Sequence, residues 1–251
     1  MERRQYRNPP IQEATCEFRC APGNEWNLTY PALLYEKIKG VYAGKPREQK
    51  MVSVEPNPKL SAPGNPSGLT VNEITRIQFP SQDEKALVAV YRDTISISVL
   101  HPYPTWETFR PRIENALNAY TIMAVPAGVR RIGLRYINML TKDGNIDDLL
   151  NYFKFPPTNL SSIQCTVDNF SDHTEYIYDD EPIRVIVNFA RTVAPAGKSS
   201  CVLDIDVAWE WPGEALPLGQ AMKKVDELRS RERVVFETLI TDRAREAFDA
   251  T

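Results

Sequence analysis

Apolar residues recur at every second position along most of the chain, as in strands that bury one face. In residues 11–20, Ala14, Cys16 and Phe18 fall on one face, and Glu17 falls on the other. Similar alternation or short apolar runs predict further strands at residues 51–54, 71–79, 86–92, 94–100, 129–140, 163–167, 174–178, 183–189 and 201–211. The chain is therefore predicted to be rich in antiparallel sheet.

Apolar residues three and four positions apart predict amphipathic helices between these strands. The clearest helix follows Thr105, and its apolar stripe contains Trp106, Phe109, Ile113, Leu117 and Tyr120. Other helices are expected at residues 28–40, 146–153 and 216–239, with a short final turn at residues 242–248. Arginines and acids alternate along the long helix, including Arg229, Arg231 and Glu232, and we interpret them as its solvated face.

The order of these elements predicts an α+β fold, in which antiparallel sheets carry helices on one face. Two halves, residues 1–125 and 126–251, each contain a strand, a helix, three or four strands and a helix. They are read either as two α+β halves or as one compact domain. A duplicated β-α-β-β-β-α unit explains the repetition, but the halves share no matching residues, so a chance similarity of strand-rich halves stays open.

Charge and hydropathy limit the classes of partner. The net charge of −3 and the pI of about 5.6 argue against nucleic-acid binding through overall positive charge. The first residues lack the apolar core of a signal peptide, and no apolar run reaches the roughly 18 residues that cross a bilayer. We therefore expect a cytoplasmic protein with no membrane segment.

The residues that usually carry chemistry form no recognisable site. Cys16 and Cys20 lie among apolar neighbours on a predicted strand, which favours buried structural thiols over a zinc site. His101 and His173 are too few for a histidine-rich metal site, and His173 has the acidic neighbours of a solvated histidine. The sequence also lacks a G-x-S-x-G nucleophile elbow, a phosphate-binding loop and a G-x-G-x-x-G motif. We expect no catalytic residue, no metal and no cofactor.

The strand at residues 129–140 carries the candidate binding residues. Arg131 and Arg135 share one face with Gly133 between them, whereas Tyr136 and Asn138 occupy the other face. We select Arg131, Arg135, Tyr136 and Asn138 as candidate ligand- or partner-binding residues, because paired guanidinium groups can hold a phosphate, a carboxylate or an acidic chain. A structural alternative is favoured for the arginines, namely cross-strand ion pairs with the acidic residues Glu13, Glu17, Asp204, Asp206 and Glu210.

Three segments in order carry a family resemblance: Pro9-Pro10-Ile11-Gln12-Glu13-Ala14, then Arg131-Ile132-Gly133-Leu134-Arg135-Tyr136-Ile137-Asn138, then Phe236-Glu237-Thr238-Leu239-Ile240-Thr241-Asp242. Together they resemble a sporadically distributed prokaryotic family of proteins of about this length, which carries a G-L-R-Y-I-N strand signature and has no assigned biochemical function. Met139-Leu140 departs from the more polar continuation expected there. The resemblance transfers no catalytic residue. Its patchy distribution implies an accessory role in anti-phage or CRISPR-linked defence.

The apolar patterns predict a well-formed core, and the sequence lacks catalytic motifs. Together these features favour a non-enzymatic interaction module, an adaptor or regulator that holds a protein partner on a sheet face or a strand edge. One alternative is a small-ligand or nucleotide sensor with an arginine-lined pocket. Another is an RNA-binding sheet with Tyr176 and Tyr178 as stacking residues. The acidic pI and the lack of an RNP1-like motif disfavour this last function.

Overall fold

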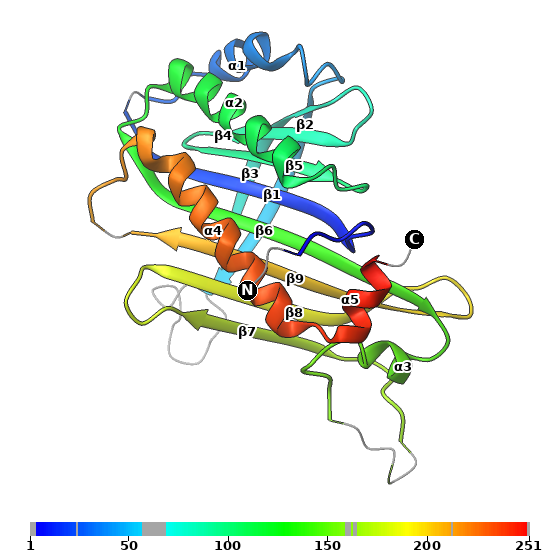
Figure 1. Ribbon diagram of the computed structural model, residues 1–251. Helices are drawn as coiled ribbons and strands as arrows, with labels where there is room; N and C mark the ends of the chain where they lie inside the picture. Colours follow the sequence, from blue (N-terminus) through cyan, green and yellow to red (C-terminus); the bar gives the residue numbers. More distant parts are fainter. Residues whose placement is uncertain are drawn as a thin grey trace.

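A computed structural model describes residues 4–23, 25–56, 69–158, 162, 165–211 and 213–249, with side chains described outside 51–56 and 69–73. Within this part of the chain, all the strands belong to one antiparallel sheet in the order β2-β3-β4-β5-β1-β6-β9-β8-β7 (Figure 1). The strands are β1 Ile11–Ala21, β2 Arg47–Pro56, β3 Leu69–Pro80, β4 Ala86–Tyr91, β5 Thr94–Leu100, β6 Gly128–Asp143, β7 Ser171–Ile177, β8 Ile183–Thr192 and β9 Lys198–Glu210.

The helices cover one face of this sheet, which confirms the predicted α+β class (Figure 1). They are α1 Tyr30–Ile38, α2 Trp106–Ala124, α3 Ile146–Leu150, α4 Leu218–Leu239 and α5 Asp242–Asp249. Helix α2 packs on β5, α4 packs on β6 and β9, and α1 packs on α2. None of the helices in the described ranges is long and apolar enough to cross a membrane.

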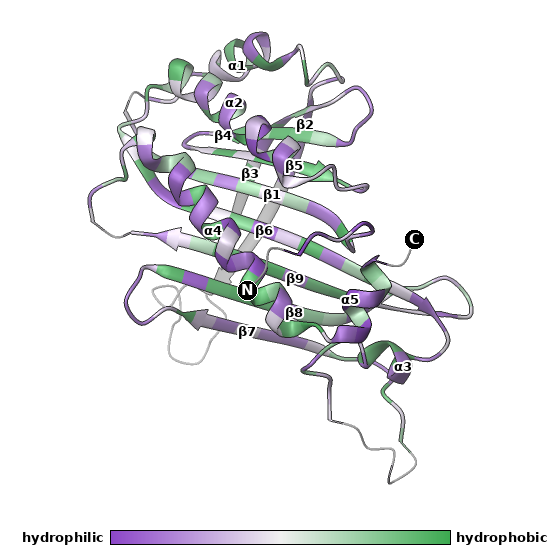
Figure 2. Cartoon of the chain, viewed as in Figure 1, coloured by the Kyte–Doolittle hydropathy of each residue, from purple (hydrophilic) through white to green (hydrophobic). Residues whose placement is uncertain are grey.

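The predicted alternation places the core between the sheet and its helices. Phe18, Ile132, Leu134 and Val207 are fully buried on the helix face of the sheet. The hydropathy colours in Figure 2 show the same alternation of hydrophobic and hydrophilic residues along the central strands. The face opposite the helices, called the open face below, therefore receives the polar half of each strand.

The two halves of the chain follow the same connectivity. β1 and β6 pair with each other at the centre of the sheet. Each is followed by a helix and then by a meander whose last strand returns to pair beside it: β5 beside β1, and β9 beside β6. This order is what the duplication hypothesis expects, but a common origin of the halves stays a prediction.

One predicted strand is wrong. Residues 165–167 form no strand, and residues 163 and 164 lie outside the described part. Cys165 therefore does not lie on a strand as the sequence pattern suggested, and it is exposed. Val167 and Phe170 pack against the core from outside the sheet instead, and the Phe170 ring centroid lies 4.9 Å from that of Phe189.

The β2–β3 hairpin leaves the plane of the sheet. β3 pairs with β4 only over Ile77 to Pro80, and its preceding part pairs with β2 alone. Figure 1 shows this hairpin passing behind the sheet, on the open face. An ion pair from Arg76 to Glu17 of β1, 3.5 Å long, ties the base of the hairpin to that face.

Candidate binding site

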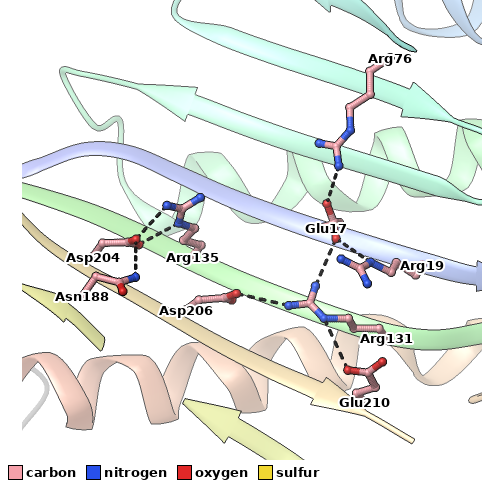
Figure 3. Close-up of polar contacts among 9 residues, drawn as sticks. All are labelled: Glu17, Arg19, Arg76, Arg131, Arg135, Asn188, Asp204, Asp206 and Glu210. Atoms are coloured by element: carbon pink, nitrogen blue, oxygen red, sulfur yellow. Dashed lines mark hydrogen bonds and ion pairs between the residues drawn. The ribbon is translucent and has the colours of Figure 1, made fainter. Parts of the chain in front are cut away.

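Arg131 lies at the centre of an ionic network on the open face, drawn in Figure 3. Its guanidinium donates to Glu17 on β1 at 3.2 Å and to Asp206 on β9 at 3.3 Å. Glu210 lies 4.0 Å from its Nε, and Glu17 also meets Arg76. One arginine on β6 therefore connects both neighbouring strands and, through Glu17, the base of the β2–β3 hairpin.

Arg135 forms a second ionic cluster on the same face, separate from that of Arg131 in Figure 3. Its Nε and Nη2 atoms each donate to one oxygen of Asp204, both at 2.8 Å, in a two-bond fork. Asn188 on β8 donates to the same carboxylate at 3.0 Å. Burial raises the pKa of the neighbouring Asp206 carboxyl, although Arg131 and Arg135 partly offset the rise.

Gly133 is explained by the side chain of Arg131. A Cβ added at Gly133 would lie 2.7 Å from Nη1 of Arg131 and 3.1 Å from its Nη2. The absence of a side chain at this position lets the guanidinium lie flat over the strand between its acidic partners. The close approach expected at Gly133 is therefore made by a side chain of the same strand.

These contacts confirm the structural alternative for the two arginines, since both are held in cross-strand ion pairs. The four candidate residues do not meet in one pocket, because Tyr136 and Asn138 point to the helix face. Tyr136 is buried, and its hydroxyl lies 3.2 Å from that of Tyr103. Asn138 is buried too, and its amide group donates to the backbone oxygens of Tyr136 and Leu203 at 3.4 and 3.2 Å.

Asn138 also lines a cavity on the helix face, which we call the α4 cavity. Its walls are the N-terminal segment 4–11, residues 103–107 at the entrance and first turn of α2, and one side of α4. Beside it, Arg229 of α4 donates to Glu232 and holds its guanidinium over the Tyr136 and Trp106 rings, 4.6 and 5.6 Å from their centroids. An ion pair thus sits in the wall of a cavity rather than in solvent.

The prediction of a fully solvated charged face on α4 is wrong at this pair. The Glu232 side chain is 3% exposed and that of Arg229 is 15% exposed. Burial raises the pKa of Glu232, and Arg229 partly offsets this rise. The sequence did contain a signal, because Glu232 lies four residues after the buried Leu228 and so falls on the helix face that is directed to the core.

The N-terminal segment closes the α4 cavity as a strap, defined as residues 4–10. Tyr6 donates to Glu237 at 2.5 Å, and its ring lies edge-on to those of Phe236 and Phe248. Two backbone hydrogen bonds also hold this segment. The N–H of Asn8 donates to the backbone oxygen of Phe248, and the N–H of Met139 donates to that of Pro10, both at 2.8 Å. The strap is therefore held from α4, α5 and β6.

β7 is an edge strand of the sheet, and nearly all of its residues are exposed. On its open-face side, His173 contacts Asn188 at 2.6 Å and Glu175 at 3.2 Å. Since Asn188 also bonds Asp204, a chain of hydrogen bonds links the edge to Arg135. The RNA-stacking candidates differ: the Tyr176 side chain is exposed, whereas Tyr178 lies under the guanidinium of Arg231 at 4.5 Å.

The cysteines are mostly structural. Cys16, Cys20 and Cys201 are buried, and burial raises the pKa of both the Cys20 and the Cys201 thiols to about 12. Among the described residues, no cluster of three or more histidines, cysteines or acids is arranged to hold a metal ion.

No protein-family model and no curated protein matches this sequence. The family resemblance of the central strand therefore stays a prediction.

Proposed function

We propose that the protein is a non-enzymatic interaction module, which binds an extended segment of a protein partner along the edge of β7. The observation that carries the proposal is the exposed edge itself. Within the described part of the chain, no strand pairs with the outer side of β7. Such an edge offers a row of unpaired backbone groups that a peptide can join as an additional strand.

The register identifies which backbone groups are available. Arg191 donates to the oxygen of Phe170, and Tyr178 donates to that of Ile183, so residues 170 and 178 face β8. Hydrogen-bonded pairs alternate along an antiparallel ladder. Residues 172, 174 and 176 therefore also bond β8, and residues 173, 175 and 177 direct their N–H and C=O groups outward.

A groove beside the strand supplies pockets for side chains. Its lining includes Phe155, Phe170, Tyr176 and Phe189, which come from the segment before β7, from β7 and from β8. In strand addition, backbone bonds provide affinity, and side-chain pockets provide selectivity. This arrangement fits a peptide with apolar residues at alternate positions.

The charge of this region favours a basic partner. Residues 165–181 contain acids and one histidine but no lysine or arginine; the acids are Asp168, Asp172, Glu175, Asp179, Asp180 and Glu181. Arginines pair with three of these acids, namely Asp168, Glu175 and Glu181, and the other three leave a net negative edge. Such an edge attracts lysine- and arginine-bearing peptides and repels nucleic-acid phosphates, which argues against the RNA alternative.

The test is selection from a displayed peptide library on the full-length chain, followed by affinity measurement with the substitution Ile177→Pro. Proline removes one outward N–H and breaks no bond to β8. Ile177→Val keeps that N–H and serves as the matched control.

Enrichment of basic peptides with alternating apolar residues is expected, with binding weakened about tenfold or more by Ile177→Pro and unchanged by Ile177→Val. Equal affinity for the proline and valine variants would contradict strand addition. The role in anti-phage or CRISPR-linked defence is a further part of the proposal, and it requires that the selected sequence occur in a defence protein.

A further inference from the structure

The α4 cavity has the dimensions and walls of a small-molecule site. Its volume is about 280 Å³, slightly below the range of roughly 300–1,000 Å³ that ligand pockets occupy, which suits a small ligand. Tyr103, Trp106 and Phe236 supply flat aromatic surfaces from two separate segments. Asn138 and the Arg229–Glu232 pair supply polar groups among them. A few polar groups among aromatic surfaces are typical of pockets that orient a ligand.

The polar groups are better suited to an acid than to a base. Four arginines line the cavity, Arg4, Arg7, Arg229 and Arg233, against the three glutamates Glu107, Glu232 and Glu237. Two of these carboxylates already accept from other residues, since Glu232 is bonded by Arg229, and Glu237 by Tyr6 and Arg245. Arg233 already donates to the backbone oxygen of Arg4. Guanidinium groups carry five N–H donors each and no acceptor, so the wall still holds an excess of donors.

Arg229 is held in a manner suited to ligand recognition. The rings of Tyr136 and Trp106 fix the plane of its guanidinium, and Glu232 takes one of its donors. A cation fixed by ring contacts keeps its other N–H groups available at low cost in side-chain entropy. A buried ion pair is also costly to maintain in a purely structural role, because both charges lose their hydration.

We propose that the α4 cavity binds a small planar organic acid. The ring of this acid lies against Tyr103, Trp106 and Phe236, and its carboxylate is held by arginines of α4 and of the N-terminal strap. This site uses arginines other than Arg131 and Arg135. It lies apart from the edge of β7, so its existence does not depend on the proposed partner binding.

The test uses three probes with the full-length chain in calorimetry and thermal-shift assays. Benzoate carries both a ring and a carboxylate, benzamide has the ring without the charge, and acetate has the charge without the ring. Benzoate is expected to raise Tm with concentration and to bind about tenfold or more tightly than either benzamide or acetate. Absence of benzoate binding in the millimolar range, or equal binding of benzoate and benzamide, overturns the proposal.

Two substitutions locate the site. Arg7→Gln removes a charge from the exposed part of the strap, and Arg229→Gln removes the ring-held guanidinium. Lys37→Gln on α1 is the matched control, since it removes an equal charge from an exposed position that does not line the cavity. Both cavity variants are expected to weaken benzoate binding, Arg229→Gln about tenfold, while the control leaves it unchanged. Arg229→Gln also removes the partner of Glu232, so Arg7→Gln provides a second test that leaves this pair intact. If both folded variants bound benzoate as tightly as Lys37→Gln does, the assignment would be refuted.

Discussion

Arg131 and Arg229 are buried to almost the same extent, with 13% and 15% of their side chains exposed, but their surroundings differ. Arg131 is surrounded by acids from two neighbouring strands, Glu17 on one side and Asp206 and Glu210 on the other. Arg229 has one acid, Glu232, three residues along its own helix, and otherwise meets aromatic rings and a cavity.

The difference shows what each arginine can do. Cross-strand pairs depend on register, so the contacts of Arg131 stabilise the alignment of β6 with β1 and β9. A one-residue shift of either neighbouring strand would move these acids to the core face. Arg229 fixes no register, because its acid lies on the same helix. Its position is better explained by the cavity that it borders.

The largest expected effect is that of Arg131→Met. It removes the positive charge shared by Glu17 and Asp206 and should lower the free energy of unfolding by about 3 kcal/mol, measured by urea denaturation. The control is Arg19→Met, which also removes a partner of Glu17, but from a side chain that is 53% exposed. Its expected loss is at most about 0.5 kcal/mol. Equal losses in the two variants would show that the network does not depend on Arg131.

Arg229→Met should cost about 2 kcal/mol, because the methionine still fills space between the rings but leaves Glu232 without its cation. Burial already raises the pKa of Glu232 in the folded protein. A group with a raised folded pKa takes up a proton on folding, so the free energy of unfolding should fall as pH rises above the usual glutamate range. The variant should show this fall more steeply than the unsubstituted protein.

The double variant Arg229→Met with Glu232→Gln separates the two contributions. It removes the charge that the single variant leaves buried, and it should recover most of the lost stability. It should also abolish the additional pH dependence. A double variant that is less stable than the single one at pH 8, about four units above an ordinary glutamate pKa, would mean that the unpaired Glu232 carboxylate is not the source of the loss.

Gly133→Ala tests how closely Arg131 lies over β6. The new Cβ would meet the guanidinium at 2.7 Å, and the expected loss is about 1 kcal/mol because Arg131 is fixed by its acids and cannot move away freely. The same substitution in the Arg131→Met background should cost less, which a double-mutant cycle measures. Gly40→Ala is the control, since no atom lies within 4 Å of its added Cβ. Additive losses at Gly133 and Arg131 would contradict the close contact.

The charged residues that share the open face could be predicted, because the face of each residue depends on alternation alone. Once residues 129–140 and 201–211 are strands of period two, Arg131 and Arg135 must share faces with one another, and so must Asp204 and Asp206. Neighbouring strands then bring the charges together. The reason for Gly133 followed only from the structure, because sequence cannot show in which direction the Arg131 side chain lies.

The α4 cavity could not be predicted in the same way. Its walls come from residues near 4–11, 103–107 and 229–237, and no periodic pattern relates these segments. The alternation of charges along α4 predicted a solvated face, whereas Glu232 is among the buried residues of this helix. The position of the β2–β3 hairpin on the open face could not be predicted either, because it depends on tertiary contacts. The local sequence pattern defines the two strands but not the direction in which they leave the sheet.

The smallest effect concerns the exposed end of the hydrogen-bond chain that begins at Arg135. The bonds of His173 with Asn188 and then with Glu175 raise its pKa above the usual 6.5. A histidine with a raised folded pKa contributes stability that is present below the unfolded pKa and lost as pH rises through the folded value. Titration of the His173 ring by NMR should show the raised pKa.

Substitution of the partners tests the origin of this shift. Asn188→Ala should lower the pKa of His173 the most, Glu175→Gln should lower it less, and Asp172→Asn should have the smallest effect, because Asp172 acts only through charge. Since His173 is exposed, salt should screen the contribution of Asp172 before that of the bonded partners. If Asp172→Asn moved the pKa as far as Asn188→Ala does, the shift would reflect the overall acidity of the β7 edge. The hydrogen-bond chain that begins at Arg135 would then end at Asn188.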